Sequence, residues 1–559
     1  MKKAIAIGVQ SFEQIRQEDC FYIDKTYFIK EWFESRDAVT LITRPRRFGK
    51  TLNMDMLNCF LSNRFANRGD LFEGLSIWED EKYRNMQGTY PVIFLSFAGV
   101  KSNNYKSCII AIKNIIIELY EKYPFLINSE EISDERKKIF CQMRSDISEE
   151  QLIISLKILS ELLFKHFGKK VIILLDEYDT PLQEAYLSGY WNELSGFIKN
   201  LFNNTFKTNP YLDRAVMTGI TRISKESFFS DLNNVDVTTT TSNKYETCFG
   251  FTEEEVFKSL DEFGKSSEKE NIKAWYDGFI FGNSKDIYNP WSIINFLDKG
   301  KYDTYWTNTS SNNLPSRLIQ KSAPRVKHIM QDLLEGQPLV TQIDEQIIFN
   351  QLDNNVDAIW SLLLASGYLK PQKVTTDEET YEKTYELVLT NREVKLMFEK
   401  MFAGWFNKIE YYSEFIDSLL KNDVRMMNQY MNGVALETFS YYDTGKGLSF
   451  SAPERFYHGF VLGLLVDMRK QYQILSNRES GFGRYDVMLI PKKENLNAYV
   501  LEFKVYDQEE EKDLKETVKS GLAQIKDKNY DADLLAKGIS KDRIFHYCFA
   551  FEGKKILIG

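Results

Sequence analysis

Residues 41–51 combine glycine, lysine and threonine in an order that suits phosphate binding. The segment reads Leu-Ile-Thr-Arg-Pro-Arg-Arg-Phe-Gly-Lys-Thr. Its apolar start indicates a buried strand, and Gly49-Lys50-Thr51 is predicted to open a helix that continues over 52–62. Such a strand–loop–helix directs backbone N–H groups and the helix dipole at one point. Lysine and threonine are the side chains that a nucleotide phosphate and its Mg²⁺ require there, so we expect a nucleoside triphosphate site.

The same loop departs from the common phosphate-binding pattern at its first position. The pattern G-x-x-x-x-G-K-[ST] begins with glycine, whereas this chain has Arg44 there. Arg46, Arg47 and Phe48 complete the loop and are expected to border the nucleotide. The three arginines could contact phosphate, contact a partner or be solvated. Solvation or partner contact is favoured, because three guanidinium groups do not all fit around one triphosphate.

A second apolar run ends in acids and suits the other half of a triphosphatase site. Residues 171–179 read Val-Ile-Ile-Leu-Leu-Asp-Glu-Tyr-Asp. Asp176 would hold the Mg²⁺ shell through water, and Glu177 would orient or deprotonate the attacking water. The alternative is a buried strand that ends in a solvated acid. The pairing with Gly49-Lys50-Thr51 favours the site.

A third predicted strand adds two candidates at its end. Thr218 could lie beside the γ-phosphate as a polar sensor, and Arg222 could contact charge that develops in the transition state. A strand end followed by an ordinary surface arginine explains the same residues equally well. Arg222 could serve its own site or that of a neighbouring subunit.

Two carboxylates and a lysine near the C-terminus form a different constellation. Asp486 lies in the apolar run 485–490, and residues 499–505 read Tyr-Val-Leu-Glu-Phe-Lys-Val. Period-two geometry places Glu502 and Lys504 on one face of a strand. Such groups among apolar neighbours are costly unless they serve one another or a metal. Two acids can hold Mg²⁺, and an adjacent lysine can orient or deprotonate water for attack on a phosphodiester.

Two flanking residues extend this second set. Glu454, on a helix predicted before the strands, could add a metal contact. Gln524, on a helix predicted after them, could position water or backbone. The alternative is alternating charge on an exposed strand, which is common, but the ordered combination favours the metal site.

The elements that position the first set belong to an α/β pattern over residues 1–240. Short apolar strands alternate there with amphipathic helices, which indicates a mostly parallel sheet with helices on both faces. Strands are predicted at 39–43, 92–97, 171–175 and 214–219, and helices at 106–122 and 149–167.

The rest of the chain divides into two further parts. Residues 241–445 are predicted to form a mainly helical lid or connecting region, with a β excursion at 367–389. Residues 446–559 are predicted to form a compact α/β unit. Its strands are expected at 473–476, 485–490, 498–506 and 544–551, and its helices at 453–471 and 509–526.

Aromatic residues are dense in the middle region and could have a role of their own. Trp275–Phe279, Tyr288, Trp291, Tyr305 and Trp306 could form a base-stacking platform, although an aromatic core is favoured. Near the N-terminus, Phe21–Thr26 could clamp an adenine base, although simple packing is favoured.

Composition narrows the class of protein. A chain of 559 residues is too long to fold around a single hydrophobic core. Its net charge of −9 restricts any nucleic-acid contact to local patches. The six cysteines are scattered and form no metal-binding pair, as expected for reduced thiols. We find neither a signal peptide nor a membrane-spanning run, so a cytoplasmic protein without a membrane partner is expected.

With these residues the chain resembles a bacterial family that joins an N-terminal AAA-ATPase-like domain to a C-terminal PD-(D/E)XK nuclease-superfamily domain. The resemblance implies an ATP-binding P-loop core with Lys50, Thr51 and the pair Asp176-Glu177. It also implies a restriction-endonuclease-like C-terminal fold, with Asp486, Glu502 and Lys504 on the nuclease motif. Members often carry an Arg-Pro-Arg-Arg-Phe-Gly-Lys loop, so Arg44 follows this family. The matching stretches are 21–26, 44–51, 171–179, 218–224, 275–279, 288–292 and 483–504.

The leading hypothesis is an ATPase whose first domain controls a Mg²⁺-dependent nuclease in the last domain. ATP and Mg²⁺ are the expected cofactors, and nucleic acid is the expected partner, with DNA favoured over RNA. The alternative is a nucleotide-gated switch whose C-terminal module binds nucleic acid or protein without cleaving it. A purely scaffolding protein is the third hypothesis. A homo-oligomer is compatible with the sequence, which leaves monomer, dimer and hexamer open.

Overall fold

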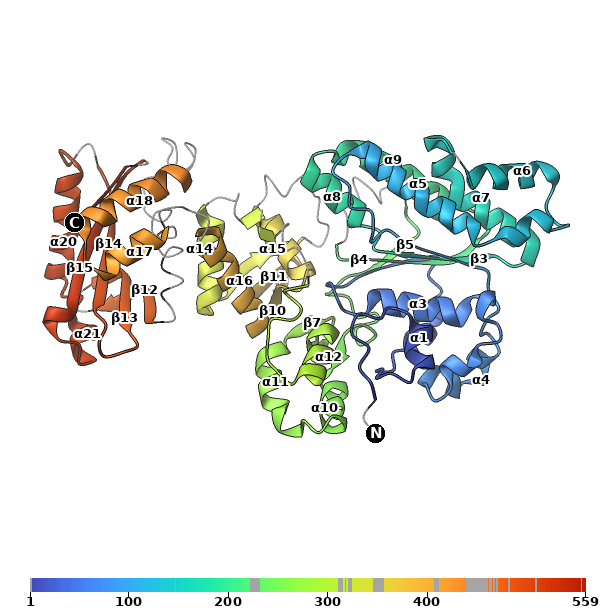
Figure 1. Ribbon diagram of the computed structural model, residues 1–559, viewed down its shortest axis with the longest axis horizontal. Helices are drawn as coiled ribbons and strands as arrows, with labels where there is room; N and C mark the ends of the chain where they lie inside the picture. The colour runs from blue at the N-terminus through green and yellow to red at the C-terminus, as the bar shows by residue number, and fades with distance from the viewer. Residues whose placement is uncertain are drawn as a thin grey trace. The chain divides into compact units, whose positions relative to one another are not determined.

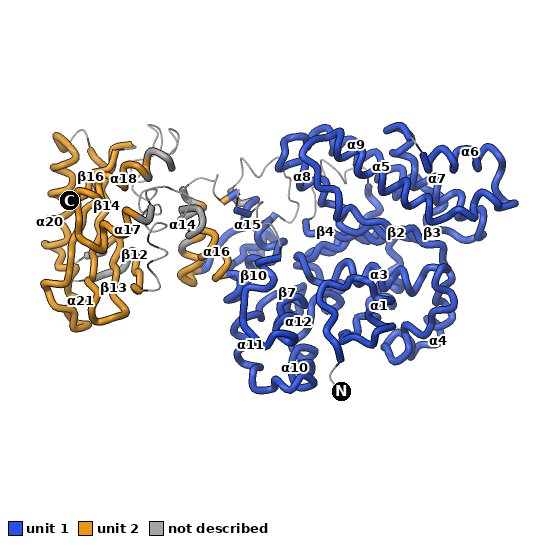
Figure 2. Tube along the Cα trace, viewed as in Figure 1, with its two compact units in different colours: residues 1–318, 338–394 blue, residues 319–337, 395–559 orange. Residues whose placement is uncertain are grey.

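The chain groups into two compact units in the computed structural model. The first contains residues 1–318 and 338–394, and the second contains residues 319–337 and 395–559 (Figure 2). The three-part division expected from the sequence stays a prediction, and its middle part is shared between both units. The structure describes residues 3–145, 147–221, 232–309, 315–316, 318–319, 324–344, 356–406, 412–438, 461, 465, 468, 471–480, 483–507, 510–553 and 555–559.

The first unit is built on a five-stranded parallel sheet with the order β2-β3-β4-β1-β5. Its strands have these bounds: β1 (Val39–Thr43), β2 (Val92–Ser96), β3 (Val171–Asp176), β4 (Leu212–Gly219) and β5 (Val235–Thr238). The order inserts β4 between β1 and β3. The carboxyl ends of these three strands therefore meet at one edge, where ligands bind in open α/β sheets.

Helices cover both faces of this sheet (Figure 1). Period-two alternation along β3 explains why, since Ile173 and Leu175 belong to one core and Ile172 and Leu174 to the other. On one face lie α5 (Tyr105–Glu121), α6 (Asp134–Met143), α7 (Glu149–Phe167), α8 (Thr180–Ser188) and α9 (Trp191–Phe202). On the other lie α1 (Phe12–Gln17), α3 (Lys50–Leu61) and α4 (Glu81–Arg84), and α2 (Tyr27–Ser35) adds to the same core.

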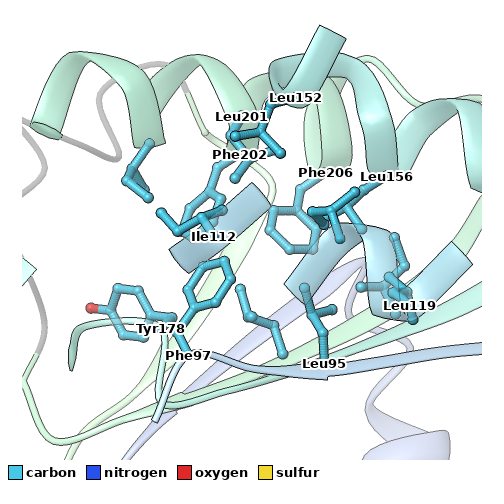
Figure 3. Packing of buried hydrophobic residues seen from close by; sticks show 14 of the residues in the cluster. Leu95, Phe97, Ile112, Leu119, Leu152, Leu156, Tyr178, Leu201, Phe202 and Phe206 are labelled. Carbon is cyan, nitrogen blue, oxygen red and sulfur yellow. The ribbon is translucent and has the colours of Figure 1, made fainter. Parts of the chain in front are cut away.

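The core beneath α5, α7 and α9 is the larger of the two. Figure 3 shows Ile112, Leu156 and Phe202 from these helices above Leu95 and Phe97 from the end of β2. These side chains are fully or almost fully buried. The α/β prediction for this part of the chain is confirmed, and its predicted strands match to within two residues.

The rest of the first unit contains two small sheets and short helices. One sheet has the order β6-β8-β7, and the other has the order β10-β11-β9. The strands are β6 (Phe251–Thr252), β7 (Phe279–Phe281), β8 (Ser284–Tyr288), β9 (Leu339–Gln342), β10 (Leu369–Thr376) and β11 (Lys383–Leu389). The helices are α10 (Glu253–Glu262), α11 (Lys269–Tyr276), α12 (Pro290–Lys299) and α15 (Val356–Ala365).

The second unit is a mixed five-stranded sheet with helices, as expected for an α/β module. Its order is β12-β13-β14-β15-β16, and only β14 and β15 run parallel. The strands are β12 (Tyr472–Ser480), β13 (Gly483–Pro491), β14 (Ala498–Val505), β15 (Ile544–Glu552) and β16 (Lys555–Ile558). The helices are α14 (Pro324–Glu335), α17 (Tyr412–Leu420), α18 (Val424–Thr438), α20 (Leu514–Asp527) and α21 (Ala532–Ala536).

One helix, α16 (Arg392–Phe406), begins in the first unit and continues into the second. Its residues 392–394 belong to the first unit and the remainder to the second. Within the described residues, no helix is both long and apolar enough to cross a membrane.

Candidate functional site

Side chains from two strand ends and from the start of α3 meet at the carboxyl edge of the parallel sheet. Thr51 Oγ1 donates a hydrogen bond of 2.8 Å to Asp176 Oδ2, and Thr218 Oγ1 donates one of 2.5 Å to Asp176 Oδ1. Asp176 and Thr218 are fully buried. Burial raises the pKa of the Asp176 carboxyl, while its two hydroxyl donors act against that rise. The three residues predicted to share a site are therefore in direct contact.

Lys50 lies across its own loop. The helix α3 starts at Lys50, and Gly49 precedes it with a φ of 80°, in the left-handed region that suits glycine. Lys50 Nζ donates to the carbonyls of Arg44 at 2.9 Å and Pro45 at 2.8 Å. Burial lowers the pKa of this ammonium group, and nearby Glu177 acts in the opposite direction. The ammonium group holds the loop closed around the start of α3.

Arg44 is buried, which corrects the expectation of a solvated or partner-contacting arginine for this one of the three loop arginines. Arg47 is exposed, as that expectation had it. Arg44 Nη1 donates to the carbonyls of Thr43 at 3.0 Å and Thr239 at 2.6 Å. Its Nη2 donates to the carbonyls of Lys244 and Tyr245, each at 3.3 Å. Burial lowers the pKa of the guanidinium to about 10. Arg44 thus fixes the base of the loop to the segment after β5, a role that a glycine at this position does not have.

The other loop residues contact the middle of the chain. The Arg46 carbonyl accepts hydrogen bonds from Asn289 Nδ2 at 3.3 Å and from Trp306 Nε1 at 3.0 Å. The exposed Arg47 guanidinium lies 4.5 Å from the centre of the Trp291 ring. The Phe48 ring is buried against Phe279 and Phe281, with centroids 4.7 and 5.3 Å away. Because the Phe48 ring is buried, only the backbone of Phe48 is available to contact a nucleotide.

Glu177 occupies an unusual backbone position beside this cluster. Its φ is 51°, in the left-handed region that few non-glycine residues adopt. Its N–H donates to Thr218 Oγ1 at 3.4 Å, and its Oε2 accepts from Thr180 Oγ1 at 3.1 Å. The carboxylate is thereby bonded to Thr180, the first residue of α8. The predicted Arg222 lies outside the described residues.

Asp179 is a structural part of the site that the sequence did not single out. Its Oδ2 accepts from the N–H groups of Ile220 at 2.9 Å and Thr221 at 3.0 Å, and from Thr221 Oγ1 at 3.0 Å. Gln183 Nε2 donates to the same oxygen at 2.9 Å. Burial raises the pKa of Asp179. The carboxyl fixes the end of β4 to the start of α8, and only its place in the run 171–179 could have drawn attention to it.

The donor set at this edge fits a magnesium-bound triphosphate. The N-cap of α3 is glycine and no side chain caps the helix, so no capping group occupies its first N–H groups. A hydroxyl and a carboxylate, from Thr51 and Asp176, are oxygen ligands of the kind that Mg²⁺ prefers. Lys50 supplies the positive charge.

The second predicted set also comes together, on the face of β14 that α20 covers. Val500 packs in the core with Ile525 of α20, whereas Leu501 and Phe503 pack in the opposite core. Glu502 and Lys504 continue the Val500 side, and Lys504 Nζ lies 3.4 Å from Glu502 Oε1. From β13, Asp486 Oδ2 accepts from the N–H of Phe503 at 2.7 Å.

The helix α20 completes this arrangement through Gln524. Its Nε2 donates to Glu502 Oε1 and, at 3.2 Å, to the hydroxyl of Tyr530. Burial raises the pKa of Tyr530, and the charges of Glu502 and Asp486 act in the same direction. Tyr530 was missed from the sequence, because an isolated tyrosine after a helix carries no signal. The predicted metal contact Glu454 lies outside the described residues.

Close approach of α20 to the sheet depends on Gly521. A Cβ atom there would lie 2.2 Å from Cys548 Sγ, on β15.

Within the described residues no group of three or more histidines, cysteines or acids is arranged to hold a metal ion. The described donors for Mg²⁺ are thus the two carboxylates Asp486 and Glu502, which is compatible with an ion that keeps several waters.

Several of the aromatic and N-terminal residues for which two alternatives were left open pack in the protein interior. Tyr276 and Tyr288 are fully buried, and Trp306 is almost fully buried. In the segment 21–26, Lys25 Nζ is buried in an ion pair with Glu255 at 2.7 Å, which leaves it turned towards α10. Trp275, Trp291 and Tyr305 are only partly buried.

Comparisons with known proteins match two parts of the chain to described families. Residues 6–229 match a family described as a predicted AAA-ATPase, and residues 452–559 match the PD-(D/E)XK nuclease superfamily. Over 561 aligned residues the chain is 24% identical to a protein of Azotobacter chroococcum mcd 1 described as an uncharacterized protein in the vnfD 5' region. The alignment spans 96% of this chain and 95% of that relative. The chain therefore joins an AAA-ATPase-like domain to a PD-(D/E)XK nuclease-superfamily domain.

Proposed function

We propose that this chain, with its AAA-ATPase-like and nuclease-superfamily domains, is an ATPase that regulates a Mg²⁺-dependent nuclease. The observation that carries the first half is the contact of Thr51 and Thr218 with the two oxygens of Asp176. In this proposal Lys50 leaves the carbonyls of Arg44 and Pro45 and binds the phosphates instead. Thr51 and Asp176 hold the metal, and Glu177 orients or deprotonates the attacking water.

The second half rests on Asp486, Glu502 and Lys504, which the sheet and α20 bring together. When bound there, Mg²⁺ would polarise the scissile phosphate and lower the pKa of a bound water. Asp486 and Glu502 would hold the ion, and Lys504 would orient or deprotonate the water. Gln524 holds Glu502 in place, because its amide donates to Glu502 Oε1. Nucleic acid is the proposed substrate, with DNA favoured.

Paired substitutions at Thr51 test the nucleotide site. Thr51→Val keeps the size of the side chain but removes the hydroxyl, whereas Thr51→Ser keeps the hydroxyl. We expect Thr51→Val to lose the Mg²⁺-dependent part of ATP affinity, and Thr51→Ser to retain it. Lys50→Ala should abolish binding of a fluorescent ATP analogue in titration. Binding by Lys50→Ala as tight as that of the wild type would contradict the site.

A cleavage assay tests the second site. The protein is incubated with DNA or RNA and Mg²⁺ or Mn²⁺, in the presence of ATP, a non-hydrolysable analogue or no nucleotide. We expect metal-dependent cleavage whose rate depends on nucleotide, and its loss in Glu502→Gln and Lys504→Ala. Glu552→Gln, at a partly exposed carboxylate of β15 that pairs with Lys555, is the matched control. Nucleotide-dependent binding of nucleic acid without any cleavage would favour a nucleotide-gated switch instead.

A further inference from the structure

The Arg46 carbonyl is a point where the nucleotide loop meets the middle of the chain. Two side-chain donors converge on it, Asn289 Nδ2 at 3.3 Å and Trp306 Nε1 at 3.0 Å. A carbonyl oxygen has two lone pairs, so this pair of donors uses its full capacity. Arg46 directly follows Pro45, whose own carbonyl accepts from Lys50. A change in what Lys50 binds therefore acts one residue away from this contact.

One buried carboxylate, Glu393, accepts directly from Trp306 and is joined to Asn289 through Ser292. Its Oε1 accepts from the N–H of Trp306 at 2.6 Å, and its Oε2 accepts from Ser292 Oγ at 2.8 Å. Asn289 is joined to Ser292 because its side chain caps α12, with Oδ1 accepting from the N–H of Ser292 at 3.3 Å. Glu393 is 1% exposed. A carboxylate so deeply buried is costly unless its oxygens are bonded, so its bonds keep Asn289 and Trp306 in a fixed arrangement.

Glu393 is the second residue of α16, the helix that continues into the unit containing Asp486 and Glu502. An unbroken series of contacts thus runs from Lys50 and the loop, through Trp306, to the start of this helix. The series contains specific hydrogen bonds that a single substitution can remove. Its residues Asn289, Trp306 and Glu393 are not among the predicted catalytic residues.

We propose that Asn289 and Trp306 are positioning residues of the nucleotide site, and that Glu393 links loop occupancy to helix α16. The proposal rests on ATP binding at the loop, as proposed above. Lys50 exchanges its loop carbonyls for phosphate, residues 44–46 relax, and the Arg46 carbonyl shifts against its two donors. Coupling of this kind is reciprocal, so the state of α16 also alters nucleotide affinity.

Trp306→Phe is the sharpest test of this coupling. It removes the indole N–H but keeps a ring for the contacts with Phe279 and Tyr368, whose centroids lie 5.3 and 5.4 Å away. Trp32→Phe is the matched control, because Trp32 is also buried in the first unit and its indole bonds to Thr40 Oγ1 at 3.1 Å, outside the loop. Asn289→Ser is a second variant, since serine still caps α12 but is too short to reach Arg46.

Hydrogen–deuterium exchange of peptides covering 392–406 is measured in the full chain with and without a non-hydrolysable ATP analogue, and nucleotide Kd is measured in parallel. Wild type and Trp32→Phe should show a nucleotide-dependent change in exchange there. Trp306→Phe and Asn289→Ser should still bind nucleotide, with altered Kd, but lose that change. A purely structural role would alter exchange equally with and without nucleotide.

The outcomes separate this inference from the proposed function. A wild type that binds no nucleotide overturns both. A wild type that binds nucleotide without any change at 392–406 overturns the coupling alone. Persistence of the change in both loop-contact variants, at the wild-type magnitude, also overturns the coupling while leaving the nucleotide site intact.

Discussion

At the scale of single residues, Arg44 shows how the loop 44–51 is held without the first glycine of the common phosphate-binding pattern. A glycine there would leave space, whereas Arg44 fills it and donates to four backbone carbonyls. The loop is thus held by a side chain at the position where the common pattern relies on a flexible backbone. Changing Arg44 to the consensus residue should weaken the site.

Arg44→Gly tests this interpretation. It leaves buried carbonyls unpaired, at about 1–3 kcal/mol for each uncompensated group, so we expect a loss of at least about 3 kcal/mol in the free energy of unfolding. Arg47→Gly is the control in the same loop. Its φ is 64°, where glycine is unstrained, and it loses mainly the contact with Trp291. Urea unfolding of both variants provides the measurement, and equal stability of the two would contradict the role of Arg44.

Glu393 predicts a pH dependence of stability. Burial raises its pKa from 4.5 to about 7, and nearby Asp303 adds to the rise, although three hydrogen-bond donors act against it. Between these values the folded state keeps a proton that the unfolded state has lost, so stability falls as pH rises, by about 1.4 kcal/mol per pH unit and roughly 3 kcal/mol in all. Glu393→Gln carries no such proton.

Urea midpoints of wild type and Glu393→Gln at pH 5 and pH 8 measure this difference. The wild type should lose stability relative to the variant over that interval, because only the wild type has a carboxyl at position 393 to titrate. Parallel pH profiles for the two proteins would mean that Glu393 is ionised in both states across the interval.

The sequence could identify only those residues whose type and spacing follow a recognisable pattern. Lys50, Thr51 and Asp176 follow from strand–loop–helix and strand–acid patterns, and Glu502 with Lys504 from period two. Asp179 and Tyr530 could not be identified, because their partners come from distant segments and involve backbone groups or a side-chain amide. Their part in the two sites becomes visible only when β4 and α20 are in place.

At the scale of elements, the second site depends on how closely one helix approaches the sheet. Gly521 lies one turn before Gln524 on α20 and faces Cys548 of β15. Without a side chain at 521, the helix can lie close enough for Gln524 to reach Glu502. The site is therefore set by a residue that takes no part in its chemistry.

Gly521→Ala should displace α20. Its Cβ would lie 2.2 Å from Cys548 Sγ, and overpacking of this kind typically costs about 1–3 kcal/mol. We expect lower thermal stability and a loss of any metal-dependent cleavage. Cys548→Ala added to Gly521→Ala removes the sulfur and should restore much of both, so a double-mutant cycle is the measurement. Additive effects in that cycle would place the cause elsewhere.

The elements of the fold were predicted where long apolar runs exist. β1 and α7 match their predicted bounds, since both combine a strong apolar pattern with a clear start. Six short strands were missed, namely β5, β6, β7, β8, β9 and β16. β5, for example, alternates polar and apolar residues over only four positions, and β16 has only four residues. Strands this short are decided by their neighbours in the sheet rather than by their own sequence.

At the scale of the whole molecule, the chain passes between its two units three times. It leaves the first unit after residue 318, returns at 338 and leaves again after 394. Residues 319–337, which contain α14, are thus part of the second unit although they lie far from it in sequence. The expectation of successive domains could not include this, because contacts between distant segments leave no local pattern.

A fragment of residues 395–559 should be less stable than the complete second unit. It lacks 319–337, and a synthetic peptide of that sequence should raise its Tm as peptide concentration increases. For a fragment of this size, about 1 kcal/mol of stabilisation corresponds to roughly 2–4 °C. A peptide of the same composition in scrambled order is the control. Equal shifts with both peptides would show that α14 adds nothing specific.

The threefold passage of the chain between its two units also affects how its gene can recombine. Gene fusion and recombination exchange segments that are continuous in sequence, and a module joined by a single linker can be gained or lost by one such event. The second unit here is interrupted by residues 338–394 of the first. A crossover after residue 394 would carry away only part of the second unit, and one after residue 318 would also take 338–394 from the first. The two units are therefore expected to pass between genomes as a pair.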